Sequence, residues 1–160
     1  MGIIISSFVG CGREYLKKAY GDRIKIFDAV ENISIVDETN QTNQDLLDGY
    51  INKVMEVVDD NDIVFVGSSN TVREALNERN IDYDLFYPSK ERRAEFIENQ
   101  VIKRANPKNI QKLDRYFDEW VENIDNDDSE NCFKHKLTNK GEFIANTPII
   151  IDYIESLKND

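Results

Sequence analysis

Cysteine, basic residues and long apolar runs are scarce in this chain of 160 residues, and each scarcity excludes a class of protein. Two cysteines are too few for the disulfide framework of a small secreted domain, so a reducing environment is expected. No apolar run approaches the roughly 20 residues that a membrane-spanning helix needs. The apolar start of the chain lacks the basic leading segment of a signal peptide. These absences together predict a cytoplasmic protein.

The charge is strongly unbalanced, because 31 acidic residues stand against 20 basic ones and give a formal charge of −11. Such a surface repels polyanions, so neither duplex nucleic acid nor an anionic membrane is expected as a partner. A phosphorylated small ligand would need positive potential built locally, from helix N-termini or a few arginines and lysines. The single histidine, His135, has no cysteine in metal-ligand spacing, and no metal site is expected.

Short apolar runs alternate along the chain with segments of helical periodicity. The length suits one compact domain, residues 1–160. This alternation predicts an α/β fold, a three-layer structure in which a parallel sheet of about five strands carries helices on both faces. The expected strands are 3–5, 24–27, 63–66, 83–87 and 132–137, and the expected helices include 14–20, 44–59, two between 89 and 124, and one after Thr147.

Three finer expectations concern the helices and their connections. An apolar stripe in the helix that ends near residue 124 predicts that Trp120 lies in the core, and the last helix is expected to bury Ile151. Thr71 and Glu74 have the spacing of a capping box and predict a helix start there. The polar segment 31–43 is expected to form an exposed connection.

The segment from Ser7 to Glu14, directly after the first strand, resembles a P-loop in which several positions have changed. In the pattern Gly-x4-Gly-Lys-Ser/Thr, glycines let backbone N–H groups point at phosphate oxygens, the lysine reaches the outer phosphates and the hydroxyl binds magnesium. Here Ser7 replaces the first glycine, whereas Gly10 and Gly12 are in place. Arg13 occupies the lysine position and Glu14 the hydroxyl position. The phosphate nest is kept, but the catalytic groups are lost.

Two interpretations of this loop stay open. Its residues bind a phosphate, or Gly10 and Gly12 only form a tight turn between strand and helix. Cys11 occupies a position that the pattern leaves free, and we expect a small packing residue there rather than a nucleophile. The phosphate-binding interpretation assigns the ligand contacts to Val9, Gly10, Cys11, Gly12, Arg13 and Glu14.

Segments spread over most of the chain strengthen this interpretation, namely residues 3–16, 62–69, 72–76, 82–89, 95–98 and 118–120. Together they resemble a family of small P-loop kinase-like proteins of bacteriophages, related in fold to adenylate and other nucleotide kinases. The resemblance implies a nucleotide at the loop after the first strand and a basic helical lid at about residues 89–106. It implies lid contacts from Arg93 and Arg104, and an acidic residue near the end of the second strand, where Asp28 stands. The chain departs from the family at Arg13 and Glu14.

Both of these assignments have plainer alternatives. Asp28 either orients a ligand beyond the end of its strand or is a turn carboxylate. The basic residues of the lid segment either close over phosphates or belong to a solvated helix face, because glutamates are interleaved with them.

Three functions stay open. The first is a nucleotide-binding protein without kinase activity. Its ligand would be a nucleotide, or a cyclic or short oligonucleotide. It requires no cofactor, and the role of magnesium is left open. In a bacteriophage setting it would sequester an antiviral nucleotide signal in the host cytoplasm. The second is an active nucleotide kinase that uses Arg13 in place of lysine. The third is a protein-interaction module whose acidic surface engages a basic partner. Assembly into a homo-oligomer is compatible with each.

Overall fold

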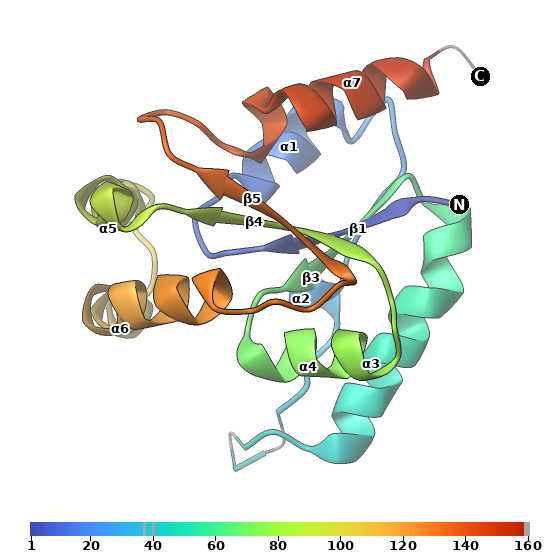
Figure 1. Ribbon diagram of the computed structural model, residues 1–160, viewed down its shortest axis with the longest axis horizontal. Coiled ribbons are helices and arrows are strands. Elements are labelled where there is room, and N and C mark those ends of the chain that lie inside the picture. The colour runs from blue at the N-terminus through green and yellow to red at the C-terminus, as the bar shows by residue number, and fades with distance from the viewer. Residues whose placement is uncertain (37, 40, 159–160) are drawn as a thin grey trace.

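Five parallel strands form the centre of the molecule in the computed structural model, which describes residues 1–36, 38–39 and 41–158 (Figure 1). The strands lie in the order β2-β3-β1-β4-β5, so that β1 pairs with β3 on one side and with β4 on the other. Their bounds are β1 Ile3–Ser7, β2 Ile26–Asp28, β3 Ile63–Gly67, β4 Tyr83–Pro88 and β5 Cys132–Leu137.

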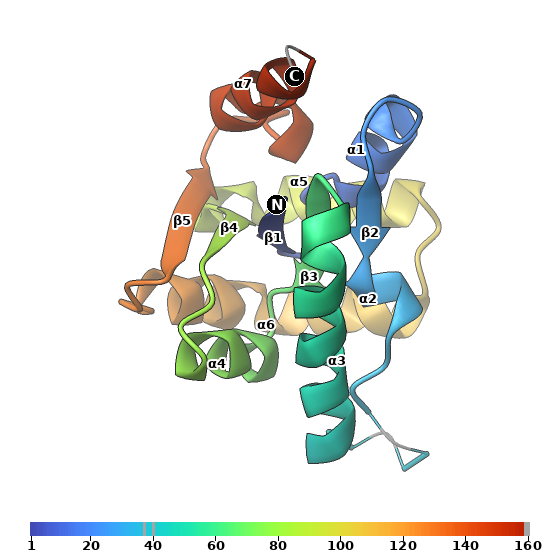
Figure 2. The same ribbon diagram turned by 90° about the vertical axis from the view of Figure 1, so that its right-hand side faces the viewer.

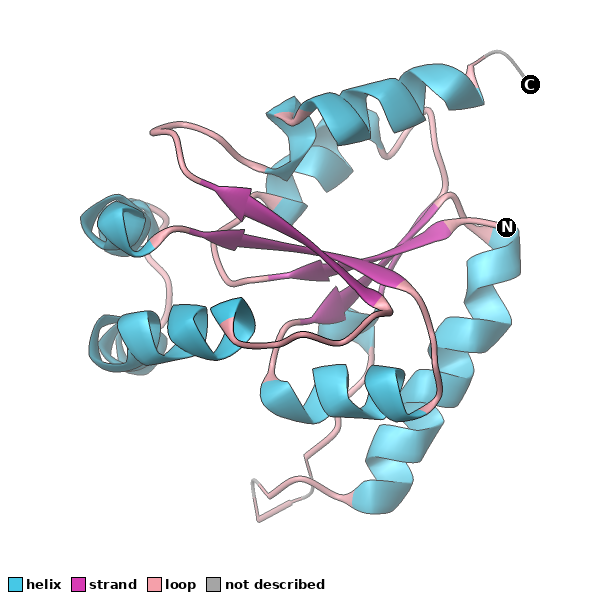
Figure 3. Ribbon diagram, in the orientation of Figure 1, coloured by secondary structure: helices cyan, strands magenta, loops and turns pink. Residues whose placement is uncertain are grey.

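Helices cover both faces of this sheet, as Figure 3 shows. Helices α1 and α7 lie on one face, and α3 and α4 lie on the opposite one (Figure 2). Helices α5 and α6 lie at the end of the molecule toward which β4 and β5 point (Figure 1). The predicted α/β fold with three layers is therefore confirmed. The bounds are α1 Arg13–Tyr20, α2 Ala29–Asn32, α3 Gln44–Val57, α4 Asn70–Glu78, α5 Arg93–Ile102, α6 Pro107–Asp125 and α7 Pro148–Leu157.

The strand order places a crevice at the carboxyl ends of β1 and β3. The chain leaves β1 toward α1 on one face, and it leaves the neighbouring β3 toward α4 on the other face. The two connections diverge from adjacent strands, and open α/β sheets bind their ligands at such a switch point.

An aromatic cluster fixes the loop after β1 to the helices beyond the sheet. The rings of Phe8, Phe96 and Phe117 pack edge to face, with centroids 5.6 to 6.4 Å apart, and all three are buried. The segment expected to form a helical lid, residues 89–106, contains α5. Because Phe96 is fully buried against Phe8, this helix is part of the hydrophobic core.

Three expectations about the helices were wrong. Trp120 is 37% exposed because it lies at the margin of the α6 stripe, whose centre is formed by Phe117 and Val121. Ile151 is 42% exposed, since α7 turns Ile150 and Ile154 toward the core instead.

The third concerns the start of α4, which precedes the predicted capping box. The Ser69 hydroxyl accepts a hydrogen bond from the Val72 N–H, so the helix begins at Asn70 rather than after Thr71.

The connection predicted over residues 31–43 is partly structured. Its first residues complete α2, and Val36 forms an isolated antiparallel bridge with Thr42. Asp37 and Asn40 of this connection lie outside the described residues. Within the described ranges, none of the helices combines the length and the apolar character that crossing a membrane would require.

Candidate functional site

A cleft of about 620 Å³ opens at the switch point between β1 and β3. This volume falls within the range of small-molecule sites, roughly 300–1,000 Å³. One wall is the loop after β1 with the start of α1, and the opposite wall is the turn from β3 into α4. Helices α5 and α6 close the remaining side, with Gln100, Lys103, Glu119, Trp120, Asn123 and Ile124.

The loop after β1 contains two glycines in the left-handed backbone region that phosphate nests use. Gly10 and Gly12 have φ angles of +85° and +96°, a region that side chains of L-residues rarely enter. Among the described residues, no protein group accepts a hydrogen bond from the N–H of Gly10, Gly12 or Arg13. Glycines in this region let neighbouring N–H groups turn toward one anion, and the N-terminus of α1 adds its positive dipole end, whereas the Cys11 N–H between them donates to the Phe8 carbonyl at 3.1 Å. The loop can therefore receive an anion.

Cys11 points away from the cleft and fixes the loop from behind. Its side chain is buried, and Sγ lies 3.6 Å from the carbonyl oxygen of Phe86. The Cys11 carbonyl accepts a hydrogen bond of 3.0 Å from the Ile144 N–H. Burial raises the pKa of the Cys11 thiol far above its ordinary value, so it stays protonated. Cys11 is thus a buried packing residue; it is not among the residues that line the cleft and its N–H donates to the Phe8 carbonyl at 3.1 Å, so the structure gives no support to the ligand contact assigned to it.

The Arg13 side chain is bound to Asp28. Its Nη1 lies 2.5 Å from both carboxylate oxygens of Asp28, and Lys17 Nζ lies 2.8 Å from Oδ2. Asp28 is 3% exposed, and its Oδ1 also accepts the N–H groups of Val30 and Glu31 that begin α2. Burial opposes ionisation of Asp28, but the bond from Lys17 and the charge of Arg13 outweigh it and hold the Asp28 pKa below its ordinary value. Asp28 therefore acts as a turn carboxylate and as an anchor for Arg13.

Three carboxylates, from Glu14, Asp28 and Glu31, place oxygens within 4.8 Å of one another. Such a group can hold a divalent ion, but the Lys17 ammonium lies among them, 3.5, 2.8 and 2.8 Å from the respective oxygens. Partial burial opposes the charge of Lys17, yet its hydrogen bonds to Asp28 and Glu31 raise its pKa above the ordinary value. A lysine that stays charged therefore occupies the position of a metal ion.

On the opposite wall, a buried arginine fixes the turn after β3. Arg73 is 3% exposed, and its Nε donates to the Ser68 carbonyl at 3.0 Å. Its Nη1 lies 2.6 Å from Oδ2 of Asp127. Burial opposes the ionisation of Asp127, but hydrogen bonds from Ser129 and Arg73 keep its pKa below the ordinary value. The charge of Arg73 is thus neutralised inside the protein.

Helix α5 contributes Gln100 to the cleft, and its C-cap residue contributes Lys103. The helix lies so close to the loop that a Cβ atom at Gly10 would be 3.1 Å from the side chains of both Gln100 and Phe96. Phe96, Gln100 and Lys103 follow one another at helical spacing and define the face that looks toward the loop. In the sequence, Gln100 and Lys103 follow the apolar Phe96 at intervals of four and three residues, and this spacing could have identified them as residues that face the loop.

The two arginines that the resemblance assigned to the lid are not among the residues that line the cleft. Arg93 lies at the first turn of α5 and donates to Asp114 of α6. Arg104 follows the last turn of α5, has a φ angle of +56° and is exposed.

Trp120 forms the aromatic part of the α6 wall. Its ring packs edge to face with Phe8, at 6.3 Å, and stacks on Tyr116 at 5.9 Å with an interplanar angle of 23°. Glu119 and Asn123 flank it as polar groups that line the same cleft. Sequence periodicity alone does not reveal that Trp120 lines the cleft, because a tryptophan at the margin of an apolar stripe has the same spacing as a residue in its core.

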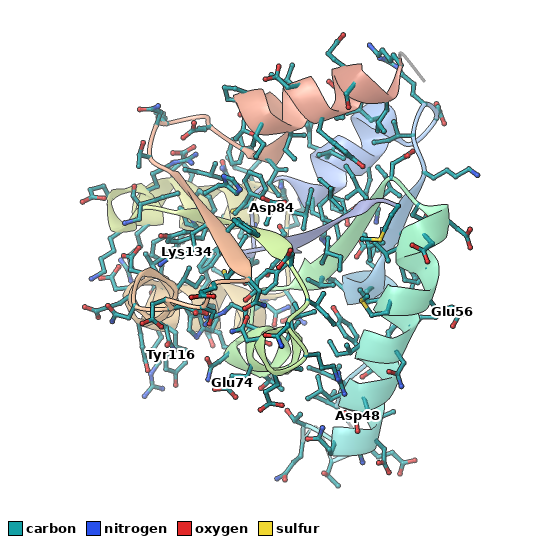
Figure 4. The ribbon with its side chains drawn as sticks, turned by 45° about the vertical axis from the view of Figure 1, so that its right-hand side comes forward. Asp48, Glu56, Glu74, Asp84, Tyr116 and Lys134 are labelled. Carbon is teal, nitrogen blue, oxygen red and sulfur yellow. The ribbon has the colours of Figure 1, made fainter. Side chains whose placement is uncertain are left out.

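His135 belongs to a different region, on the edge strand β5. Its Nε2 lies 2.8 Å from Oδ1 of Asp84, and its ring stacks on Phe86 with centroids 4.6 Å apart. Figure 4 labels Asp84 together with Lys134, a neighbour of His135 along β5. His135 is not among the residues that line the cleft.

Comparisons with known proteins leave the site to be interpreted from its own geometry. No family model matches the chain, and no curated protein matches it. Among solved structures, it is similar to an uncharacterized protein from Eubacterium ventriosum ATCC 27560 at 14% sequence identity and a TM-score of 0.48. That match covers 98% of this chain and 99% of the other. The likeness carries no information on ligand or reaction.

Proposed function

We propose that the chain binds a small phosphorylated nucleotide in the cleft between β1 and β3 and does not transfer its phosphate. One observation supports both halves of this proposal. The N–H groups of Gly10, Gly12 and Arg13 have no acceptor among the described residues, whereas the guanidinium of Arg13, at the position of the P-loop lysine, is bound to Asp28. The loop therefore retains the part of a P-loop that binds and lacks the part that acts on outer phosphates.

The proposed orientation follows from the two ends of the cleft. The phosphate lies against the N–H groups of the loop, where the Gln100 amide approaches Gly10. The base lies on the side of Trp120, because aromatic side chains stack on nucleobases regardless of their sequence. Asn123 and Glu119 are polar groups within the same wall that can bind the edge of a base.

Catalysis is disfavoured because the charges needed around a transferring phosphoryl group are engaged or reversed. Arg13 is neutralised by Asp28, and Glu14 places a carboxylate where a metal-binding hydroxyl belongs. Loss of one preorganised charge-stabilising group raises a barrier by roughly 3–4 kcal/mol. A protein that binds without turnover would hold or sequester its ligand, and the bacteriophage resemblance is consistent with that role.

Calorimetric titration with mono-, di-, tri- and cyclic nucleotides, combined with an assay of phosphate transfer from ATP, tests this function. We expect saturable binding of at least one nucleotide and no transfer. The double variant Arg13→Lys with Glu14→Thr should also show no transfer. Asp28, which Lys17 holds in place, would still bind the cation at position 13 and keep it away from the phosphates. Absence of binding to every nucleotide contradicts the proposal. Transfer by the natural chain at ordinary turnover, abolished in Arg13→Ala, would instead identify an active kinase.

A further inference from the structure

The charges that line the cleft limit how many phosphates a bound nucleotide can carry. Among the described residues, the cationic side chains that line the cleft are Arg13, Arg73 and Lys103. Arg13 is neutralised by Asp28, and Arg73 by Asp127. Lys103 has no carboxylate within ion-pair distance among the described residues, so it is the cation that remains available to a ligand.

Two carboxylates line the same cleft and oppose this single charge. Glu14 is half exposed at the start of α1, directly after the nest, where a second or third phosphate would extend. Its oxygen is 3.5 Å from Lys17 and from Arg13, which are both shared with Asp28. Glu119 lies exposed on α6, on the other side of the cleft. Counted together with their ion-pair partners Asp28, Asp127, Lys17 and Glu31, the charged side chains around the cleft therefore carry one more negative charge than positive.

A single phosphate group is compatible with this arrangement. It carries a charge of about −1.5 to −2 at neutral pH. The positive end of α1, equivalent to about half a unit charge, the N–H groups of Gly10 and Gly12, and Lys103 together offset it. Every additional phosphate adds negative charge for which the cleft has no further cation, and it comes close to Glu14 or Glu119.

We infer, on the basis of the proposed function, that the cleft selects a nucleoside monophosphate over the corresponding di- and triphosphates. The phosphate lies in the glycine nest beside Lys103, and the base lies against Trp120. Both ends of the ligand contribute, so neither the nucleoside alone nor inorganic phosphate alone binds with comparable affinity.

Calorimetry at low salt and without magnesium provides the test. For each of adenine, guanine, cytosine and uracil, the nucleoside and its mono-, di- and triphosphate are titrated into the natural chain, with inorganic phosphate as a further probe. We expect the monophosphate of the preferred base to bind at least tenfold more tightly than its triphosphate and at least tenfold more tightly than its nucleoside. A triphosphate that binds as tightly as the monophosphate, or a nucleoside that does so, overturns the charge selection but leaves nucleotide binding intact. Failure of all these nucleotides to bind overturns the proposed function itself.

Charge variants then show whether the selection comes from the cleft. The double variant Glu14→Gln with Glu119→Gln should narrow the ratio between monophosphate and triphosphate affinity at least threefold. The double variant Glu56→Gln with Glu155→Gln likewise removes two exposed charges, one on α3 (Glu56, labelled in Figure 4) and one on α7, both outside the cleft, and should leave this ratio unchanged. An equal change in both variants would show that the total charge of the protein sets the preference, and it would overturn the assignment to Glu14 and Glu119.

Discussion

The guanidinium of Arg13 lies against the carboxylate of Asp28, with Nη1 2.5 Å from each oxygen. The sequence suggests a separate ligand contact for each of these residues, yet each is the partner of the other. Their contact joins the start of α1 to the end of β2, and it withdraws from the loop the cation that a kinase would direct at outer phosphates. The same contact ties this corner of the fold together and engages the Arg13 guanidinium with a carboxylate.

Replacing Asp28 with asparagine should expose the electrostatic part of this contact. Asparagine can still cap α2, but Arg13 and Lys17 lose their buried anion, so we expect the free energy of unfolding at neutral pH to fall by about 1–3 kcal/mol. The pKa of Asp28 is lowered in the folded protein, despite its burial, by Lys17 and Arg13. Its contribution is therefore present above the unfolded pKa of about 3.9 and is lost as the pH falls through the folded value.

Urea unfolding of the natural chain and of Asp28→Asn over a series of pH values measures this directly. The difference between them should be constant from pH 7 to about pH 5 and should narrow below about pH 4. Glu31→Gln is the matched control, since Glu31 is an exposed partner of the same lysine and its removal should lower the free energy of unfolding clearly less than the removal of the Asp28 charge does. A difference that persists unchanged into strong acid would show that the charge of Asp28 is not its source.

Two glycine-to-alanine substitutions should act in opposite directions. At Gly12 the φ angle is +96°, and a Cβ atom would lie 3.1 Å from the Cβ of Phe143, so Gly12→Ala should destabilise the protein by about 1–2 kcal/mol and weaken nucleotide binding. Gly49 lies within α3, and nothing approaches its Cβ position within 4 Å, so Gly49→Ala should stabilise by about 0.5–1 kcal/mol and leave binding unchanged. Thermal unfolding and calorimetry of both variants check this, and equal effects would count against a conformational role for Gly12.

Much of the fold follows from local sequence patterns. The run Ile63–Val66 is buried on both faces of a parallel sheet, and the face of α3 that contains Tyr50 and Val54 has helical spacing, so both elements are predictable from a short window. The alternation of such elements then defines the layers. The glycine loop is likewise recognisable, because Gly10 and Gly12 follow a buried strand and precede a helix.

The details of the site depend on contacts between distant segments, which a local pattern does not contain. To predict that Arg13 binds Asp28 rather than a ligand, one would have to know that the end of β2, where Asp28 lies, is beside the start of α1. Likewise, the choice of Lys103 over Arg104 depends on the orientation of α5, which the burial of Phe96 determines. Charge and position in the chain do not distinguish these two neighbours.

Trp120→Leu should weaken nucleotide binding at least about tenfold, because stacking of a base on an aromatic ring contributes roughly 1–3 kcal/mol. Phe133→Leu is the control, since Phe133 is a half-exposed aromatic residue of β5 that does not line the cleft. Calorimetry on both variants separates a local effect from a general one. If Trp120→Leu binds like the natural chain, the base does not lie against α6.

Magnesium should have little effect on binding. The carboxylates of Glu14, Asp28 and Glu31 surround Lys17, whose ammonium already occupies the centre of the group. We expect the dissociation constant of the bound nucleotide to change less than about twofold on adding a chelator. A tenfold loss of affinity, equivalent to about 1.4 kcal/mol, would show that an ion takes part in binding.

The fluorescence of Trp120 tests the central claim most directly, because it is the single tryptophan of the chain and it lines the cleft. The measurement is the emission of the natural protein during titration with AMP, GMP, CMP and UMP. If the cleft binds a nucleotide with its base beside Trp120, at least one of them will change the emission saturably, and Gly12→Ala will shift that titration to higher concentration. If none of the four alters the emission, the cleft does not bind nucleotides in this way.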